Sequence, residues 1–359
     1  MSGSNVGKRA LVTGACGFSA GYVIDLLLKE GWSVKATDLK TANRTSLEKF
    51  GDKIEFIPGD LTKKDTLKDA VKDVDIVFHP AAIFSYSAPM ELLRKVNVEG
   101  TKNLIEASMD AGVKKMVLWS SVALYGTADP KWYKIPITED QELNPKCEGK
   151  YDLSKREQET AAMEYYKENG FPITAIRPAP IYGPGSYYGI YTLFKYVQQA
   201  SLPACPRNMH KKSIPLVHAE DIAGAALYLS DDKKYNGEAY NVVDDNVLDM
   251  VQTLKFIAFH TQQRMKILLP MPIKIFKPFL KLIGKWSFWE AQHLRKKVDG
   301  KPPVPKLETD TIIYMFGNFH FSNQKIKDAG YQFKYPDRRI GLLETLIWYD
   351  NNGWLPPHK

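Results

Sequence analysis

The sequence predicts an α/β protein built on a doubly wound parallel sheet, with a smaller lobe interleaved at its C-terminal end. In the first half of the chain, short runs rich in Val, Ile and Leu alternate with helical patterns. These runs are apolar throughout rather than at every second residue, which is typical of parallel strands buried on both faces. Right-handed crossovers between such strands place helices on both sides of the sheet.

The elements follow one another at short intervals. Strands are expected over 9–14, 32–38, 53–60, 75–82, 114–121 and 171–178, and helices over 21–31, 66–73, 90–112 and 151–169. After Pro178 the regular alternation of strand and helix patterns stops, although a strand and a helix reappear at 213–230. We therefore assign 1–178 and 213–243 to the main domain, and 179–212 and 244–359 to a substrate-binding lobe.

Composition narrows the class of protein. The chain has 359 residues and a net charge of +8, and the excess is not gathered into an aromatic, basic patch, which argues against nucleic-acid binding. Its three cysteines are too few and too scattered for a disulfide framework or a zinc site. A signal-peptide pattern and a run of 18 apolar residues are both missing, so we expect a cytoplasmic protein without a metal centre.

A phosphate-binding turn is expected in "TGACGFSAG", between the first strand and the first helix. Gly14 and Gly17 allow the backbone to approach a pyrophosphate at the positive end of the helix. Asp38 ends the second strand, where a carboxylate accepts hydrogen bonds from an adenosine ribose and repels a 2′-phosphate. NAD is therefore favoured, while Lys40 and Arg44 leave NADP open.

A candidate catalytic set follows at the carboxyl ends of later strands. Ser121 ends the strand "MVLWSS", and Tyr151 and Lys155 share one face of the next helix. A free tyrosine has a pKa near 10. We expect the Lys155 cation to lower the pKa of Tyr151, which could then exchange a proton with a substrate hydroxyl or carbonyl.

The order of these motifs resembles that of extended short-chain dehydrogenases/reductases, the NAD-dependent epimerase/dehydratase superfamily. The matching segments are "TGACGF", "GDL" (59–61), "HPAA" (79–82), "VNVEGT" (96–101), "SSVALYG" (120–126), "YDLSK" (151–155), "RPAPIYGPG" (177–185) and "LVHAEDIA" (216–223). The resemblance implies a Rossmann fold, an NAD(P)-dependent oxidoreductase and a homodimer formed through the helices that follow Asn97 and Tyr151. In this chain Ser19-Ala20 stands where the family has an aliphatic residue and glycine.

The resemblance also implies roles for individual residues. Ser121, Tyr151, Lys155 and Asn97 would be the catalytic set. The cofactor would be bound by Gly14, Cys16, Gly17, Phe18, Asp38, Asp60, Leu61, Ala81, Ala82, Tyr151, Lys155, Pro178 and Ile181. Within this set, Asp60 would meet the adenine, Lys155 the nicotinamide ribose, and Pro178 and Ile181 the nicotinamide.

The substrate is less clearly indicated. The polar anchors of nucleotide-sugar enzymes are not obvious at Pro178-Ala179 or at Ser213-Ile214-Pro215. Residues 270–297 combine apolar side chains with lysines at helical spacing, a pattern of membrane-surface helices and also of core helices with a solvated face. This lobe loosely resembles the 3β-hydroxysteroid and sterol-4-carboxylate 3-dehydrogenase branch.

Several functions remain open from the sequence. The leading one is an oxidoreductase for a secondary alcohol or ketone on an apolar, steroid- or isoprenoid-like substrate, with peripheral membrane contact through 270–297. The alternatives are a nucleotide-sugar epimerase or dehydratase, a reductase of the dihydroflavonol-reductase type, and a cofactor-sensing binding protein. The intact set of Ser121, Tyr151 and Lys155 argues against a sensor, which has no need of it.

Overall fold

The computed structural model describes residues 7–126, 132–147, 149–199, 204–245, 248–268 and 319–355, and isolated residues between 278 and 293. Its centre is a seven-stranded sheet in the order β10-β6-β5-β4-β1-β2-β3, and all the strand pairs are parallel. The strand order reverses at β1: β2 and β3 lie to one side of it, and β4, β5, β6 and β10 lie to the other. The sheet is therefore doubly wound, and the predicted fold class is confirmed.

The strands coincide with the predicted apolar runs. They are β1 (Arg9–Thr13), β2 (Ser33–Asp38), β3 (Ile54–Pro58), β4 (Ile76–His79), β5 (Lys115–Trp119), β6 (Ile173–Pro178) and β10 (Ala239–Val242). Successive side chains on a strand point to opposite faces of the sheet. Val12 and Phe78 accordingly join a core on one face, whereas Leu11 and Val77 join a core on the other.

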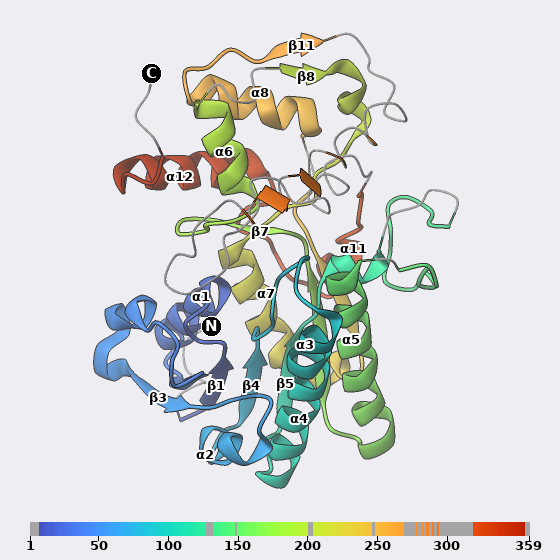
Figure 1. Cartoon of the computed structure of the whole chain (residues 1–359). Coiled ribbons are helices and arrows are strands. Elements are labelled where there is room, and N and C mark those ends of the chain that lie inside the picture. Colours follow the sequence, from blue (N-terminus) through green and yellow to red (C-terminus); the bar gives the residue numbers. More distant parts are fainter. Residues whose placement is uncertain are drawn as a thin grey trace.

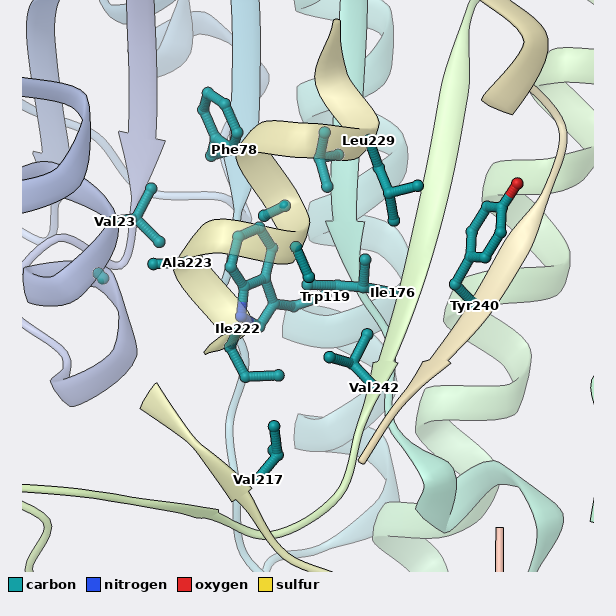
Figure 2. Close-up of a cluster of buried hydrophobic side chains, with 14 of the residues drawn as sticks. Val23, Phe78, Trp119, Ile176, Val217, Ile222, Ala223, Leu229, Tyr240 and Val242 are labelled. Carbon is teal, nitrogen blue, oxygen red and sulfur yellow. The ribbon is translucent and has the colours of Figure 1, made fainter. Parts of the chain in front are cut away.

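Helices cover both faces. The helices of the main domain are α1 (Phe18–Lys29), α2 (Lys68–Val71), α3 (Met90–Leu93), α4 (Gly100–Asp110), α5 (Lys150–Asn169), α7 (Ala219–Ser230) and α11 (Gln324–Asp328). Figure 2 shows α7 lying against the sheet, with Ile222 and Leu229 facing Trp119 and Ile176. Leu104 of α4 and Ala162 of α5 pack into the core on the opposite face.

Short helical turns join several of these elements. They are η1 (Thr45–Lys53), η2 (Lys64–Leu67), η3 (Arg94–Glu99), η4 (Val122–Tyr125), η5 (Arg207–Lys211) and η6 (Lys233–Tyr235). The turn η3 is a π-helix between α3 and α4, so the helix predicted over 90–112 is present but carries a local widening at Asn97. A π-helical turn inside an α-helix is frequently found at a functional site.

The first helix ends earlier than predicted. Its last residue is Lys29, and Gly31 beyond it has φ +79°, the left-handed conformation that ends many helices. The helix predicted over 66–73 is likewise shorter, because its first residues form the 3₁₀ turn η2.

A second hydrophobic core lies beyond the sheet. It gathers side chains from α6 (Ile190–Gln198), α8 (Met250–His260) and α12 (Arg338–Asn351), which stand together at the upper end of the molecule in Figure 1. Two small parallel pairs accompany these helices: β7 (Ile181–Tyr182) with β9 (Val217–His218), and β8 (Ala204–Pro206) with β11 (Lys266–Leu268).

The second core and the sheet are interleaved in the sequence. Strand β10 completes the main sheet, and Phe319, Phe321 and Ile326 pack into the core on the α7 side of it. These three side chains come from the stretch 244–359 that the sequence assigns to the second lobe. The exact domain boundaries therefore stay a prediction.

The segment 270–297 lies for the most part outside the described residues. Its described residues include the large hydrophobic side chains Leu282, Trp286 and Trp289, and all three are exposed. Among the helices that the structure describes, none combines the length and the apolar character needed to cross a membrane.

Candidate active site

The predicted site residues converge at the carboxyl ends of β1, β4 and β5. The loop after β1 holds Gly14, the loop after β4 holds Ala81, and Ser121 follows β5. Helix α5 begins at Lys150, beside the 3₁₀ turn η4 that Ser121 caps. The second lobe lies beyond the same strand ends (Figure 1). Ligands of doubly wound sheets bind in this position, outside the point where the strand order reverses.

The loop between β1 and α1 can approach a pyrophosphate because two of its residues have no side chain. Gly14 has φ +57°, and a Cβ atom added to it would stand 2.9 Å from the Cα of Ala81. The Gly17 N–H donates to the Gly14 carbonyl at 2.8 Å, which closes the turn directly before α1. The cradle therefore fits the phosphates of NAD, with the N-terminal N–H groups of α1 facing it.

Gly14→Ala is expected to weaken NAD binding roughly tenfold, because the new methyl group must displace the Ala81 loop and occupy a left-handed backbone conformation at a cost of ~1–3 kcal/mol. Isothermal titration calorimetry with NAD measures the change. Gly21→Ala is the matched control, since a Cβ there meets nothing within 4 Å. Equal affinities for the two variants would contradict the proposed cradle.

Asp38 reaches back from the end of β2 to the glycine loop. One carboxylate oxygen accepts a hydrogen bond from the Cys16 N–H at 3.0 Å, and the other accepts one from the Leu39 N–H at 2.8 Å. Burial, reinforced by the charge of Asp38, raises the pKa of the Cys16 thiol to about 11, so Cys16 is a neutral thiol. Arg44 lies over the ring of Phe56 at 5.0 Å.

The other predicted cofactor residues line the same edge. Asp60 accepts hydrogen bonds from the N–H and hydroxyl of Thr62, so its carboxylate caps a turn; burial opposes ionisation, but these bonds hold its pKa below the usual value. Leu61 packs against Gly100, where a Cβ would approach within 2.9 Å. The contacts of Asp60 and Leu61 with adenine remain predictions.

Pro178 and Ile181 flank the far side of the edge. Pro178 is the buried last residue of β6, and Ile181 opens β7 and is partly buried against the main core. Ala82 and Phe18 are also partly exposed at this edge. The expected contacts of Pro178 and Ile181 with a nicotinamide ring stay predictions.

Ser121 and Tyr151 meet directly. The Ser121 oxygen accepts a hydrogen bond from the Ala123 N–H at 3.1 Å, which holds the side chain as the cap of η4, and Ser121 also hydrogen-bonds to Tyr151. Tyr151 is 7% exposed. Burial raises the pKa of its phenol, and the hydrogen bond with Ser121 lowers it by a smaller amount.

The expectation that Lys155 lowers the pKa of Tyr151 is wrong for this arrangement. The Lys155 ammonium donates at 2.6 Å to the carbonyl of Trp119 and also to the side-chain oxygen of Gln158, rather than to the phenol. Its own pKa is lowered to about 7, because burial disfavours the charge and Glu159 offsets only part of that effect. Lys155 can thus lose its charge near neutral pH.

Asn97 holds the backbone near the site. Its side-chain oxygen accepts from the Ile83 N–H at 2.7 Å, and its amide donates to the Ile83 carbonyl at 3.2 Å and to Ser154 at 3.1 Å. Asn97 is fully buried and fixes the segment after β4 against α5. In this structure it positions the chain that carries Phe84.

Three aromatic side chains that the sequence reasoning missed surround Tyr151. The rings of Phe84 and Tyr86 meet the Tyr151 ring edge to face, with centroids 5.0 and 5.7 Å away, and Tyr188 lies 5.6 Å from Phe84. Phe84 is 53% exposed. We call Phe84, Tyr86 and Tyr188 the aromatic wall. The aromatic residues of "IFSYS" (83–87) and "GSYYG" (185–189) were its only signal in the sequence.

The family model of the NAD dependent epimerase/dehydratase family matches residues 10–242. The chain therefore belongs to that family, and it is an enzyme that uses NAD. It is 30% identical to the decarboxylating sterol-4-alpha-carboxylate 3-dehydrogenase of Bos taurus over 66% of this chain and 65% of the bovine enzyme.

Proteins with other names also match this chain. Cinnamoyl-CoA reductase 1 of Petunia hybrida is 30% identical over 98% of this chain and 94% of the reductase. The solved structure of UDP-glucose 4-epimerase from Thermotoga maritima superposes with a TM-score of 0.71 at 19% identity, covering 96% of this chain and 99% of the epimerase. The last comparison supports the fold alone.

Proposed function

We propose that the enzyme transfers hydride between NAD(H) and a secondary alcohol or ketone on an apolar ring substrate of steroid or isoprenoid type. The observation that carries the proposal is the aromatic wall beside Tyr151. The exposed ring of Phe84 and the partly buried rings of Tyr86 and Tyr188, next to a proton-transfer group, favour a flat apolar substrate over a heavily hydroxylated one.

The proposed mechanism assigns one task to each side chain. NAD, when bound, supplies the hydride acceptor. In the oxidation, Tyr151 first loses its phenol proton to solvent; the phenolate then takes the proton of the substrate hydroxyl while hydride leaves the same carbon, and the ketone forms. In the reduction, the Tyr151 phenol donates its proton to the ketone oxygen. Ser121 hydrogen-bonds to that oxygen, and Lys155 holds the nicotinamide ribose.

The test is a screen of 3β-hydroxysteroids and isoprenoid alcohols with NAD and NADP, followed at 340 nm. We expect NADH to form with at least one apolar secondary alcohol. If no absorbance change appears with any of them, while a UDP- or dTDP-sugar is converted, the nucleotide-sugar epimerase or dehydratase alternative replaces this proposal. Stoichiometric NAD retained through purification would point the same way. A cinnamoyl- or dihydroflavonol-type reductase would be recognised by consumption of NADH with those carbonyl compounds.

Phe84→Ala is expected to raise KM for the apolar substrate about tenfold while it changes kcat little, because the removed ring packs against the substrate and transfers no proton. Steady-state kinetics measure both constants. Phe259→Ala is the control, since its ring is 76% exposed on α8, away from Tyr151. A decrease of kcat with unchanged KM would contradict substrate contact through the aromatic wall.

Peripheral membrane contact through 270–297 is a further part of the proposal. Leu282, Trp286 and Trp289 of this segment are exposed, and an apolar substrate would be delivered from a bilayer. We expect the protein to sediment with vesicles that contain phosphatidylserine, and Trp286→Ser together with Trp289→Ser to reduce the bound fraction severalfold. Equal sedimentation of both proteins would contradict the membrane contact.

We also propose a homodimer built on α4 and α5, on the basis of the family resemblance. Light scattering after size-exclusion chromatography should give twice the mass of one chain. A monomer at micromolar concentration would contradict it.

A further inference from the structure

A chain of buried hydrogen bonds connects the cofactor loop with Lys155. The Thr13 hydroxyl lies 2.7 Å from Nδ1 of His79, and Nε2 of His79 lies 2.9 Å from the Thr101 hydroxyl. The side-chain amide of Gln158 donates to that hydroxyl at 2.8 Å, and its oxygen accepts from Lys155. Thr13, His79, Thr101 and Gln158 are all 0% exposed. We call these four residues the buried relay.

The protons of the buried relay can be placed by counting donors. Thr101 has one hydroxyl proton, and it is donated to the Asn97 carbonyl at 2.7 Å. Thr101 must therefore accept from His79, whose proton lies on Nε2. Burial, together with the nearby charge of Lys155, lowers the pKa of His79 to about 3, so the ring is neutral and Nδ1 accepts from Thr13.

The same count fixes the orientation of Gln158. Its NH₂ group faces the Thr101 oxygen, and its carbonyl oxygen faces an ammonium that can only donate. An ammonium has three N–H bonds. The Trp119 carbonyl and the Gln158 side-chain oxygen accept two of these N–H bonds. Because both acceptors are held in place by the fold, they also set the direction of the third N–H bond.

We propose that Gln158 is a positioning residue that holds the Lys155 ammonium toward the nicotinamide ribose and links it through Thr101 and His79 to the turn of the phosphate cradle. The proposal rests on the cofactor role assigned to Lys155 above, but not on the identity of the substrate. Thr13 directly precedes Gly14 and accepts at 3.3 Å from the N–H of Ala81, the residue that confines Gly14. The buried relay therefore connects both ends of the cofactor site.

The titratable groups near Lys155 come from three elements. Glu159 lies on the same helix and is paired with Arg177 of β6 at 2.6 Å. His79 of β4 is neutral, and Tyr151 stands one helical turn before Lys155. Gln158 differs from all of them because it contacts the ammonium directly and is itself uncharged.

The test measures NADH affinity against pH without any substrate. Protonated Lys155 donates to the ribose, so binding weakens as pH rises through the pKa of Lys155. Gln158→Met removes the acceptor and destabilises the charged form. We expect it to move the midpoint of the pH dependence about one unit lower, equivalent to an affinity about fivefold weaker at the wild-type midpoint and about tenfold weaker well above it. Gln158→Glu adds a carboxylate beside the ammonium and should move the midpoint about one unit higher.

NADH fluorescence titrations between mildly acidic and alkaline pH give these midpoints. Lys155→Met should show no midpoint, and Thr160→Met, an exposed position on α5, should behave as the wild type. If Gln158→Met does not fold, the upward shift of Gln158→Glu carries the test. Unchanged midpoints in the folded Gln158 variants, or a midpoint that persists in Lys155→Met, would overturn the proposal. A failed substrate screen with shifted midpoints would instead reject only the proposed reaction.

Discussion

Tyr151→Phe is expected to lower kcat about a thousandfold, because the variant keeps the ring but loses the group that exchanges a proton with substrate. NADH affinity should stay within about twofold, since the edge-to-face packing with Phe84 and Tyr86 does not need the hydroxyl. Single-turnover kinetics and an NADH titration measure the two quantities separately.

The control for this change is Tyr165→Phe on the far part of the same helix. Tyr165 donates to Glu106 at 2.7 Å, so its hydroxyl belongs to a partly buried surface contact remote from the site. Its removal should leave kcat unchanged. A Tyr151→Phe enzyme that turns over at the wild-type rate would reject Tyr151 as the proton-transfer group.

The largest effect on stability is expected for Arg338→Met, which should lower the free energy of unfolding by about 3–5 kcal/mol because it removes the buried guanidinium that pairs with the Asp244 carboxylate. Arg338 is 0% exposed, and it donates to Asp244 at 2.9 Å and to the Ile214 carbonyl at 2.6 Å. Urea unfolding followed by circular dichroism measures the loss.

Two further variants test whether the loss of stability comes from the Arg338–Asp244 pair or from the removal of any arginine. Arg339→Met removes an exposed pair with Asp337 and should cost less than about 1 kcal/mol. The double variant Arg338→Met with Asp244→Leu should be more stable than Arg338→Met alone, since the buried carboxylate is removed together with its guanidinium. A single and a double variant of equal stability would contradict this account of the pair.

The fold was predictable because its strands are apolar throughout and its turns have glycine at the required places. The run "ALV" of β1 and the following Gly14 define a buried strand and a tight turn without help from the rest of the chain. The widening of the helix at Asn97 was not predictable, since nothing in "RKVNVE" differs from an α-helical pattern. The side chain of Asn97 in this turn accepts a hydrogen bond from Ile83, a tertiary contact that the local sequence does not indicate.

The candidate site was predictable in its members but not in its electrostatics. The spacing of Tyr151 and Lys155 places both side chains on one face of α5, and the sequence alone suggests that they interact. In the fold, the Lys155 ammonium turns to Trp119 and Gln158, and burial then controls the pKa of both Lys155 and Tyr151. The hydrogen-bond partner of Lys155 and the pKa values of Lys155 and Tyr151 depend on burial and on residues from distant strands. The spacing of two residues on a helix does not indicate either of these.

The aromatic wall could not be predicted from the sequence either. Phe84 and Tyr188 are more than a hundred residues apart in the sequence, and they meet because the loops after β4 and β7 cover the same end of the sheet. From the sequence, the apolar substrate was proposed from the missing polar anchors, the pattern of 270–297 and the loose resemblance to the steroid branch, and none of these points to a contact near Tyr151. The fold adds a positive reason for it.

The most direct test of hydride transfer to NAD, with Tyr151 as the proton-transfer group, uses a 3β-hydroxysteroid that carries deuterium on the carbinol carbon. If the substrate screen finds an alcohol that reacts faster than the 3β-hydroxysteroid, the deuterated form of that alcohol is used instead. The NADH formed with NAD is then analysed by mass spectrometry. We predict that the reduced cofactor carries one deuterium and that the Tyr151→Phe enzyme forms it about a thousandfold more slowly. Reduced cofactor without deuterium, or equal labelling by the Tyr151→Phe enzyme, would contradict the account.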